Sequence, residues 1–202
     1  MIWLQNRFTL TFPDKLIRAD QWLMLKINRD WSHPFLDNFS LFMREPLVHV
    51  PLYLFLALFL IINFGKSGFW WLITALAMAG VNDILSSQLI KEFFDRPRPC
   101  RDETLAHQIR FIAKYCGMNG SFISSHASSH FAVATFIFFT LRSITKWFGL
   151  AFLWAACVCY AQVYVGVHYP FDVFCGAIFG LGIGFAAASL YNKKISLVNT
   201  AR

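Results

Sequence analysis

Three short polar clusters carry most of the side chains that could do chemistry in this 202-residue chain. They span residues 91–99, 123–126 and 162–172. Each cluster lies where an apolar segment begins or ends, so membrane helices could bring all three to one place. A phosphate ester carries its charge on non-bridging oxygens and is held by cationic donors and backbone N–H groups. The clusters together predict a phosphate-ester site at one face of a membrane.

The first cluster offers two cations around a turn. Lys91 precedes it, and Arg98 stands between Pro97 and Pro99. The planar guanidinium of Arg98 can bind two phosphate oxygens, while Lys91 supplies a point charge. The alternative is that these charges merely flank a membrane span.

The second cluster stands where a loop becomes a helix. Ser124 is a good helix cap, and the first N–H groups of a helix form an anion site. Ser125 follows it, and His126 at the helix mouth is a candidate general acid near neutral pH. His130 lies one turn deeper, about 6 Å along the helix, and is the alternative acid.

The third cluster contains an imidazole and a carboxylate one helical turn apart. Asp172 can accept Nδ1–H from His168, which fixes the tautomer and leaves Nε2 free to attack phosphorus. A carboxylate just inside an apolar helix is costly unless it is paired. This pairing is therefore the strongest chemical signal in the chain.

With these residues the sequence resembles the type 2 phosphatidic-acid phosphatases, membrane enzymes that share a site with vanadium haloperoxidases. Their pattern is Lys, six residues, Arg-Pro; then Pro-Ser-Gly-His; then Ser-Arg, five residues, His, three residues, Asp. The first part matches in full, and His168 with Asp172 ends the third. The departures are Ile123 for Pro, Ser125 for Gly, and Ala161-Gln162 for Ser-Arg.

The resemblance implies a metal-independent lipid phosphatase without a cofactor. His168, oriented by Asp172, would attack phosphorus to give a phosphohistidine, and His126 would protonate the departing alkoxide. Phosphatidic acid, phosphatidylglycerol phosphate, undecaprenyl diphosphate and lipid A are the expected substrate classes. The residues expected to hold phosphate oxygens are Lys91, Arg98, Ser124, Ser125 and Gln162.

Gln162 removes a full charge from the expected site, and a charge-assisted hydrogen bond is roughly twice as strong as a neutral one. Phosphate binding should weaken unless Arg96, Arg101 or another cation compensates. A catalytically weak or inactive protein that binds or transports lipid phosphate is therefore the second hypothesis. A haloperoxidase is disfavoured because those relatives are soluble.

Composition places the chain in a bilayer. Hydrophobic residues make up 57% and charged residues 14%, with 23 Phe and 7 Trp. The net charge of +7 comes from Lys and Arg scattered between apolar runs, which favours anionic lipid or substrate over nucleic acid.

The hydropathy pattern predicts an all-α, polytopic membrane bundle forming a single domain over residues 1–202. About five spans are expected, at residues 47–64, 69–90, 126–141, 147–165 and 171–191. Residues 1–46 are too interrupted to span and predict one or two interfacial helices, with Trp22 and Trp31 at headgroup depth. Glycines and alanines in the last span predict close helix packing.

Alternation of the spans puts all three clusters on one side of the membrane. The positive-inside rule then assigns the other side to the cytoplasm, so the site would face outward, as in a bacterial inner membrane with a periplasmic active site. The cations counted for this orientation are Lys66, Arg142, Lys146, Lys193, Lys194 and Arg202. The oligomeric state is not encoded in any pattern.

Cys100 and Cys116 both fall in the polar stretch between the second and third spans. In an oxidising compartment they could form a disulfide, which would stabilise that loop by roughly 3 kcal/mol. The alternative is two free thiols.

Overall fold

The computed structural model describes residues 12–94 and 96–197, and the regular structure in these ranges is helical throughout. This agrees with the predicted all-α class. Residues 1–11 of the predicted interfacial region lie outside the described residues.

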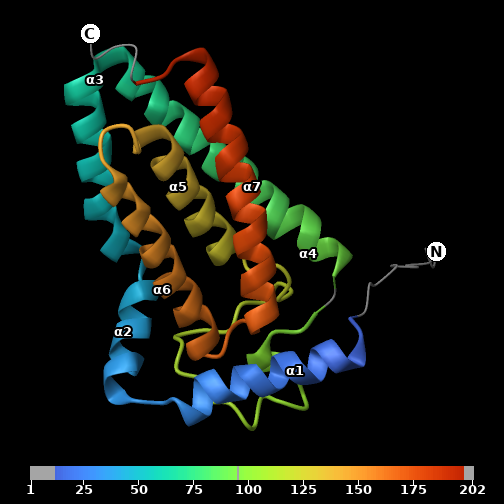
Figure 1. Ribbon diagram of the computed structural model, residues 1–202. Helices are drawn as coiled ribbons and strands as arrows, with labels where there is room; N and C mark the ends of the chain where they lie inside the picture. The colour runs from blue at the N-terminus through green and yellow to red at the C-terminus, as the bar shows by residue number, and fades with distance from the viewer. Residues whose placement is uncertain (1–11, 95, 198–202) are drawn as a thin grey trace.

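The first two predicted spans form one helical hairpin. α3 (Pro46–Asp83) runs on through a π-helical segment (Ile84–Leu89) into α4 (Ile90–Phe93). At Gly65 the backbone leaves helical geometry with a φ of 52°, which suits glycine. Beyond it a Cβ on Gly68 would collide with the carbonyl of Leu60, so the chain turns back sharply on itself. Figure 1 shows the two arms running in opposite directions.

Three further helices complete the bundle: α5 (Ser125–Leu141), α6 (Leu150–Tyr164) and α7 (Pro170–Lys194). α5 packs most extensively on α7. A Cβ on Gly176, Gly180 or Gly184 would collide with a backbone carbonyl of α5 or of its N-cap residue Ser124, whereas Gly182 faces open space. The predicted small-residue face is confirmed, because it lets these two backbones approach closely.

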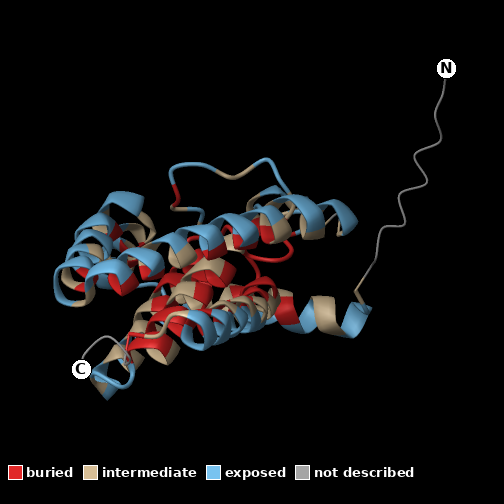
Figure 2. Cartoon of the chain, turned by 90° about the horizontal axis from the view of Figure 1, so that it is seen from above, coloured by how far each residue is buried: buried red, intermediate tan, exposed pale blue. Residues whose placement is uncertain are grey.

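Within the described part of the chain, three helical stretches are long and apolar enough to cross a membrane: Pro46–Phe93, Lys146–Tyr164 and Pro170–Lys194. The first is the hairpin, and α5, with 17 residues, packs among them. Seen down the bundle, buried positions face one another between the helices and exposed positions cover the outer faces (Figure 2). Large apolar side chains dominate those outer faces, including Leu54, Phe55, Ile62, Phe174 and Phe185. The chain is an integral membrane protein.

The N-terminal part contains α1 (Asp14–Leu25), a π-helical turn (Lys26–Asp30) and α2 (Pro34–Arg44). α1 lies across one end of the bundle, and α2 packs against α6 (Figure 1). Trp22 and Trp31 are exposed, so both rings are free to reach the headgroups, as the interfacial prediction requires. That prediction stays open for α1 and α2.

The two ends of the bundle differ in character. The long loop between α4 and α5 and the short turn between α6 and α7 lie at the α1 end (Figure 1). The Gly65 turn, the connection between α5 and α6 and the end of α7 lie at the opposite end, with Lys66, Arg142, Lys146, Lys193 and Lys194. Arg202 lies outside the described residues. The alternation predicted from the spans is therefore confirmed.

Candidate active site

The three predicted clusters meet at the α1 end of the bundle (Figure 1). Arg98 comes from the loop after α4, His126 from the start of α5, and His168 from the turn between α6 and α7. Arg98 Nη1 lies 3.1 Å from His168 Nε2, across 70 positions of sequence. His126 is close enough to both of them to interact electrostatically.

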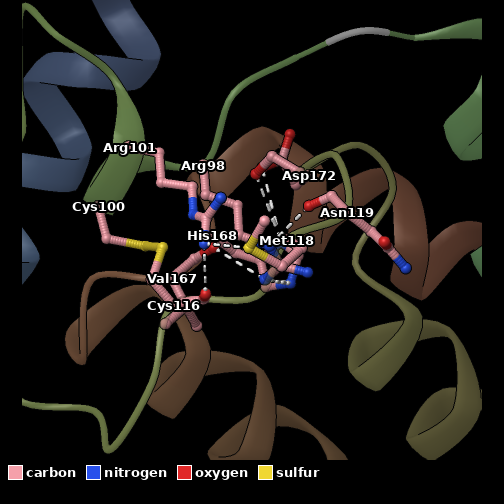
Figure 3. Close-up of a disulfide and its surroundings, with 10 residues drawn as sticks. Arg98, Cys100, Arg101, Cys116, Met118, Asn119, Val167, His168 and Asp172 are labelled. Atoms are coloured by element: carbon pink, nitrogen blue, oxygen red, sulfur yellow. Dashed lines mark hydrogen bonds and ion pairs between the residues drawn. A yellow bond between two sulfur atoms is a disulfide. The ribbon is translucent and has the colours of Figure 1, made fainter.

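Arg98 is held by residues that follow a disulfide-closed loop and by the turn before α7. Cys100 and Cys116 are bonded, which confirms the disulfide reading over free thiols. Within this loop region Arg98 Nε donates to the carbonyl of Asn119 at 3.0 Å, and Gly117 leaves room for the guanidinium, where a Cβ would press on it. Nη1 also donates to the carbonyl of Val167 at 3.3 Å. Figure 3 shows the guanidinium between the disulfide loop and the imidazole of His168.

The contact with Arg98 defines the tautomer of His168. A guanidinium can only donate hydrogen bonds, so Nε2 must accept, and the proton of the neutral ring lies on Nδ1. Burial lowers the pKa of His168 to about 4, although the nearby Asp172 favours the charged form. At neutral pH the ring is therefore uncharged, with its Nε2 lone pair directed at Arg98.

The predicted direct hydrogen bond between His168 and Asp172 is not formed. Nδ1 and Oδ2 are 3.7 Å apart, and the hydroxyl of Ser121 stands between them. Ser121 donates to Asp172 Oδ2, and its Oγ lies 3.5 Å from Nδ1. Ser121 carries no sequence signal, since it lies two positions before the second cluster in a loop of irregular structure.

Asp172 is fully buried and compensated by Arg96. Its Oδ1 accepts from Arg96 Nη1 at 2.6 Å, and its Oδ2 accepts the backbone N–H of Tyr169 at 3.0 Å. Arg96 Nη2 binds Asp20 of α1 at 2.6 Å, and Asp20 also accepts the N–H of Phe171 at 2.8 Å. The guanidinium lies 3.9 Å from the centre of the Tyr169 ring. Of the cations named as able to compensate for Gln162, Arg96 is thus already bound by carboxylates through both Nη1 and Nη2.

Lys91 lies at the end of the hairpin, in α4. Its ammonium interacts electrostatically with Arg98 and Asp172. No hydrogen bond or ion pair joins its Nζ to any residue in the described ranges, so its donors are available to an anion.

Of the polar side chains at the start of α5, some form hydrogen bonds within the protein and others have no partner. Ser124 Oγ caps the helix by accepting the N–H of Ala127 at 3.4 Å, as predicted for a cap. The Ser125 hydroxyl is buried without a partner among the described residues. His130 Nδ1 donates to the carbonyl of His126 at 2.8 Å, and its ring packs on Trp154. His126 is thereby the freer of the two candidate acids.

A cavity of about 460 Å³ opens beside His126. α2, the start of α3 and the loop around residues 112–115 form its walls. Its polar lining consists of His126, Arg44, Lys114, Glu45 and Tyr115, and the rest is largely apolar. The cavity is therefore suited to an amphipathic molecule with an anionic head.

Gln162 is completely buried, and its Oε1 accepts from Arg44 Nε at 3.3 Å. Arg101, the other cation named for compensation, is exposed and donates to the carbonyl of Cys116 at 3.2 Å and to the sulfur of Met118. Sequence reasoning missed Arg44 at this site because it lies 118 positions from Gln162.

Among the described residues, no group of three or more His, Cys, Asp or Glu side chains is arranged to hold a metal ion. The donors that converge on His168 are cationic and suit an anion.

Comparisons with known proteins agree with this geometry. Two curated relatives are named lipid A 4'-phosphatase. That of Porphyromonas gingivalis is 26% identical over 87% of this chain and 74% of its own length, and that of Bacteroides thetaiotaomicron is 29% identical over 80% and 72%.

Two solved structures share the fold. LpxE of Aquifex aeolicus gives a TM-score of 0.58 at 28% identity, over 83% of this chain and 93% of its own. A transmembrane PAP2 type phosphatidylglycerolphosphate phosphatase from Bacillus subtilis gives 0.66 at 21% identity, over 91% and 89%. The PAP2 superfamily profile matches residues 68–196, which include all three clusters and well over half of the chain. The chain belongs to the PAP2 superfamily.

Proposed function

We propose that this membrane lipid phosphatase hydrolyses a phosphate monoester of a lipid A-type glycolipid through a phosphohistidine on His168. The observation that carries the proposal is the neutral Nε2 of His168, which faces the cationic donors of Arg98 and Lys91 at a shared site. The two curated relatives named lipid A 4'-phosphatase support the choice of substrate.

In the first step, Nε2 of His168 attacks phosphorus and the bond to the lipid oxygen breaks. Arg98 moves its hydrogen bond from Nε2 to a non-bridging oxygen, so that the lone pair is released as the charge is bound. His126, buried close to Arg98 and Arg44, is neutral in the free site and takes up a proton when the negative charge of the phosphate binds beside it. It then donates this proton to the departing alkoxide. Water then attacks phosphorus, His126 takes one of its protons, and free phosphate leaves His168.

Ser121 and Asp172 support the positive charge that develops on the imidazole. When Nε2 becomes bonded to phosphorus, Nδ1–H donates more strongly to the Ser121 hydroxyl, which in turn donates to Asp172. Arg96 keeps the carboxylate in position. Phosphate oxygens are held by Lys91, Arg98 and the free hydroxyl of Ser125, with the Ser124 hydroxyl committed to the helix cap.

The cavity beside His126 is the proposed entrance for the lipid. Its apolar wall suits the lipid body, and exposed Tyr115 and Lys114 stand where sugar hydroxyls and a second anionic group would lie. The end of the bundle opposite α1 carries Lys66, Arg142, Lys146, Lys193 and Lys194. By the positive-inside rule this supports an orientation in which that end lies in the cytoplasm and the site faces the periplasm of a bacterial inner membrane.

The test is phosphate release by the detergent-purified protein from lipid A, phosphatidic acid, phosphatidylglycerol phosphate and undecaprenyl diphosphate. Lipid A should be the best substrate, and His168→Ala should abolish release. Equal release from His168→Ala would remove the proposed nucleophile. Tight binding of lipid phosphate without any turnover would instead favour the binding or transport protein raised by Gln162.

A further inference from the structure

The replacement of Arg by Gln at position 162 leaves the family's phosphate site one cation short, and Arg44 stands at the vacated place. We infer that Arg44, from the end of α2, binds the substrate phosphate together with the Gln162 amide. The inference rests on the proposed phosphate chemistry at His168 and adds a binding residue that lies outside the three sequence clusters.

Local structure fixes where Arg44 points. It is the last residue of α2, and after the single intervening residue Glu45 the helix α3 starts at Pro46. Because α2 packs along α6, the side chain of Arg44 reaches across to Gln162 and donates from Nε to Oε1. Its guanidinium is near enough to Arg98 and His126 to interact electrostatically with both.

Arg44 has no carboxylate partner. Glu45, its chain neighbour, is near enough to attract Arg44 electrostatically, but the Glu45 carboxylate forms its ion pair with Lys114 at 2.9 Å. Among the described residues, the bond to Gln162 is the one hydrogen bond that Arg44 makes, so its Nη groups remain free. A half-buried guanidinium that lines a cavity without an ion-pair partner of its own is prepared for an anion.

The Gln162 amide is the second observation that points to a ligand. Since Oε1 accepts from Arg44, the NH₂ group of the same amide is left to find another acceptor. This Nε2 is buried and has no acceptor among the described residues, while the residue as a whole is 0% exposed. A buried donor without an acceptor is costly, and a phosphate oxygen would satisfy it.

The two residues together replace one arginine. Gln162 supplies a neutral N–H donor from α6, where the family has its cation, and Arg44 supplies the charge from a neighbouring helix. The total charge facing the phosphate is thereby kept, although its source in the sequence has moved. Arg101 offers no such arrangement, because it is exposed and bound to the Cys116 carbonyl and to Met118.

The experiment measures orthovanadate binding and catalysis in four full-length variants. Thermal unfolding at increasing vanadate gives an apparent Kd, and phosphate release gives kcat/KM. Arg44→Gln should weaken vanadate binding roughly 10- to 100-fold, the range expected for hydrogen bonds from a charged donor. Arg44→Lys keeps a point charge and should lose less, and Arg101→Gln, the charge-matched control, should stay within about twofold of wild type.

The fourth variant returns the positive charge from position 44 to position 162. Arg44→Gln combined with Gln162→Arg should recover at least tenfold of the lost vanadate affinity, because the double change returns the cation to α6. A double variant that folds, with an unfolding temperature near that of wild type, but binds no better than Arg44→Gln would count against the exchange. Arg44→Gln binding vanadate as tightly as wild type would overturn the inference outright.

The two proposals fail in different ways. If wild type releases phosphate while Arg44→Gln keeps its vanadate affinity, the inference alone is lost. If wild type binds vanadate through Arg44 but releases no phosphate from any lipid, the proposed enzyme activity is lost and the assignment of Arg44 to an anion site stands. The apo unfolding temperature of each variant separates loss of binding from loss of fold.

Discussion

Two groups of cations lie side by side at the α1 end of the bundle, and their surroundings differ. Arg96 is held by Asp172 and Asp20, each at 2.6 Å, with all three side chains 10% exposed or less. Arg98, Lys91 and Arg44 have no carboxylate within ion-pair distance in the described part of the chain. Arg98 binds carbonyl oxygens and an imidazole nitrogen, Arg44 binds an amide oxygen, and the ammonium of Lys91 has no hydrogen-bond or ion-pair partner among the described residues.

The contrast separates structural charge from functional charge. A compensated buried guanidinium stabilises the fold in its given shape, and losing it leaves carboxylates stranded in a low-dielectric interior. An uncompensated one is costly until an anion arrives, so it is kept for binding. Removing Arg96 should therefore lower stability first, whereas removing Arg98 or Arg44 should lower affinity first.

The largest expected effect is that of Arg96→Gln. Two buried carboxylates lose their counter-charge, so the free energy of unfolding should fall by about 3–5 kcal/mol. Thermal unfolding in detergent measures it. Arg110→Gln is the matched control, because its ion pair with Asp37 is about one-third exposed and should contribute about 1 kcal/mol or less. Equal losses of unfolding free energy in Arg96→Gln and Arg110→Gln would mean that Arg96 is no more important for stability than an exposed arginine.

Arg98→Gln should lower activity and leave stability nearly unchanged. It removes a cation that faces the attacked phosphate, so kcat/KM should fall roughly 10²- to 10³-fold, as for the loss of one oxyanion donor. The unfolding temperature should stay within a few degrees of wild type. A large drop in stability with little change in kcat/KM would place Arg98 in the structural group instead.

His168 lies between the two groups and should make stability depend on pH. Its pKa is about 4 in the folded state, chiefly through burial, and about 6.5 when unfolded. Below pH 6.5 the unfolded chain binds a proton that the folded protein does not. Stability should therefore fall as pH drops from about 6.5 to 4, by up to about 3 kcal/mol, and stay level above that range.

The contribution of His168 is isolated by His168→Asn, which cannot titrate there. Unfolding temperatures measured from pH 8 to 4.5 should fall less steeply in this variant than in wild type. Parallel curves would mean that the pKa of His168 is the same in the folded and unfolded states, so that the folded ring would become charged below about pH 6.5, contrary to its contact with Arg98.

The smallest expected effect belongs to Ser121→Ala. The hydroxyl links Nδ1 of His168 to Asp172, so its loss should lower kcat about tenfold and leave KM nearly unchanged, because the link strengthens only as the imidazole becomes charged. Ser121→Thr keeps the hydroxyl and should retain more activity. An effect on KM alone would show that Ser121 acts on substrate binding.

Sequence reasoning predicted the helical bundle, the common end of the three clusters and the pairing of Cys100 with Cys116, because each leaves a local trace. Apolar runs define spans, alternation defines sides, and two cysteines in one polar loop have few other partners. The Gly65 turn was likewise visible as Gly65-Lys66-Ser67-Gly68 between two apolar runs.

The site residues that sequence reasoning missed belong to no recognisable sequence pattern. Ser121 and Asp20 look like ordinary loop and helix-surface residues, and Arg44 looks like a flanking charge before a membrane span. Their contacts depend on how α1 and α2 fold over the end of the bundle, which no periodicity encodes. The absence of arginine at position 162 did signal that a cation was missing, but Arg96 and Arg101, the residues first considered, are nearer in sequence and engaged elsewhere.

α1 and α2 contribute to this end of the molecule although the superfamily match begins only at residue 68. A fragment cut to residues 68–196 would keep every signature motif and still lose Asp20, the second anchor of Arg96, and Arg44, the neighbour of Gln162. Alignments restricted to the shared core would overlook both positions for the same reason. Surveys of relatives that lack the usual arginine should therefore look for its replacement upstream, just ahead of the first membrane hairpin.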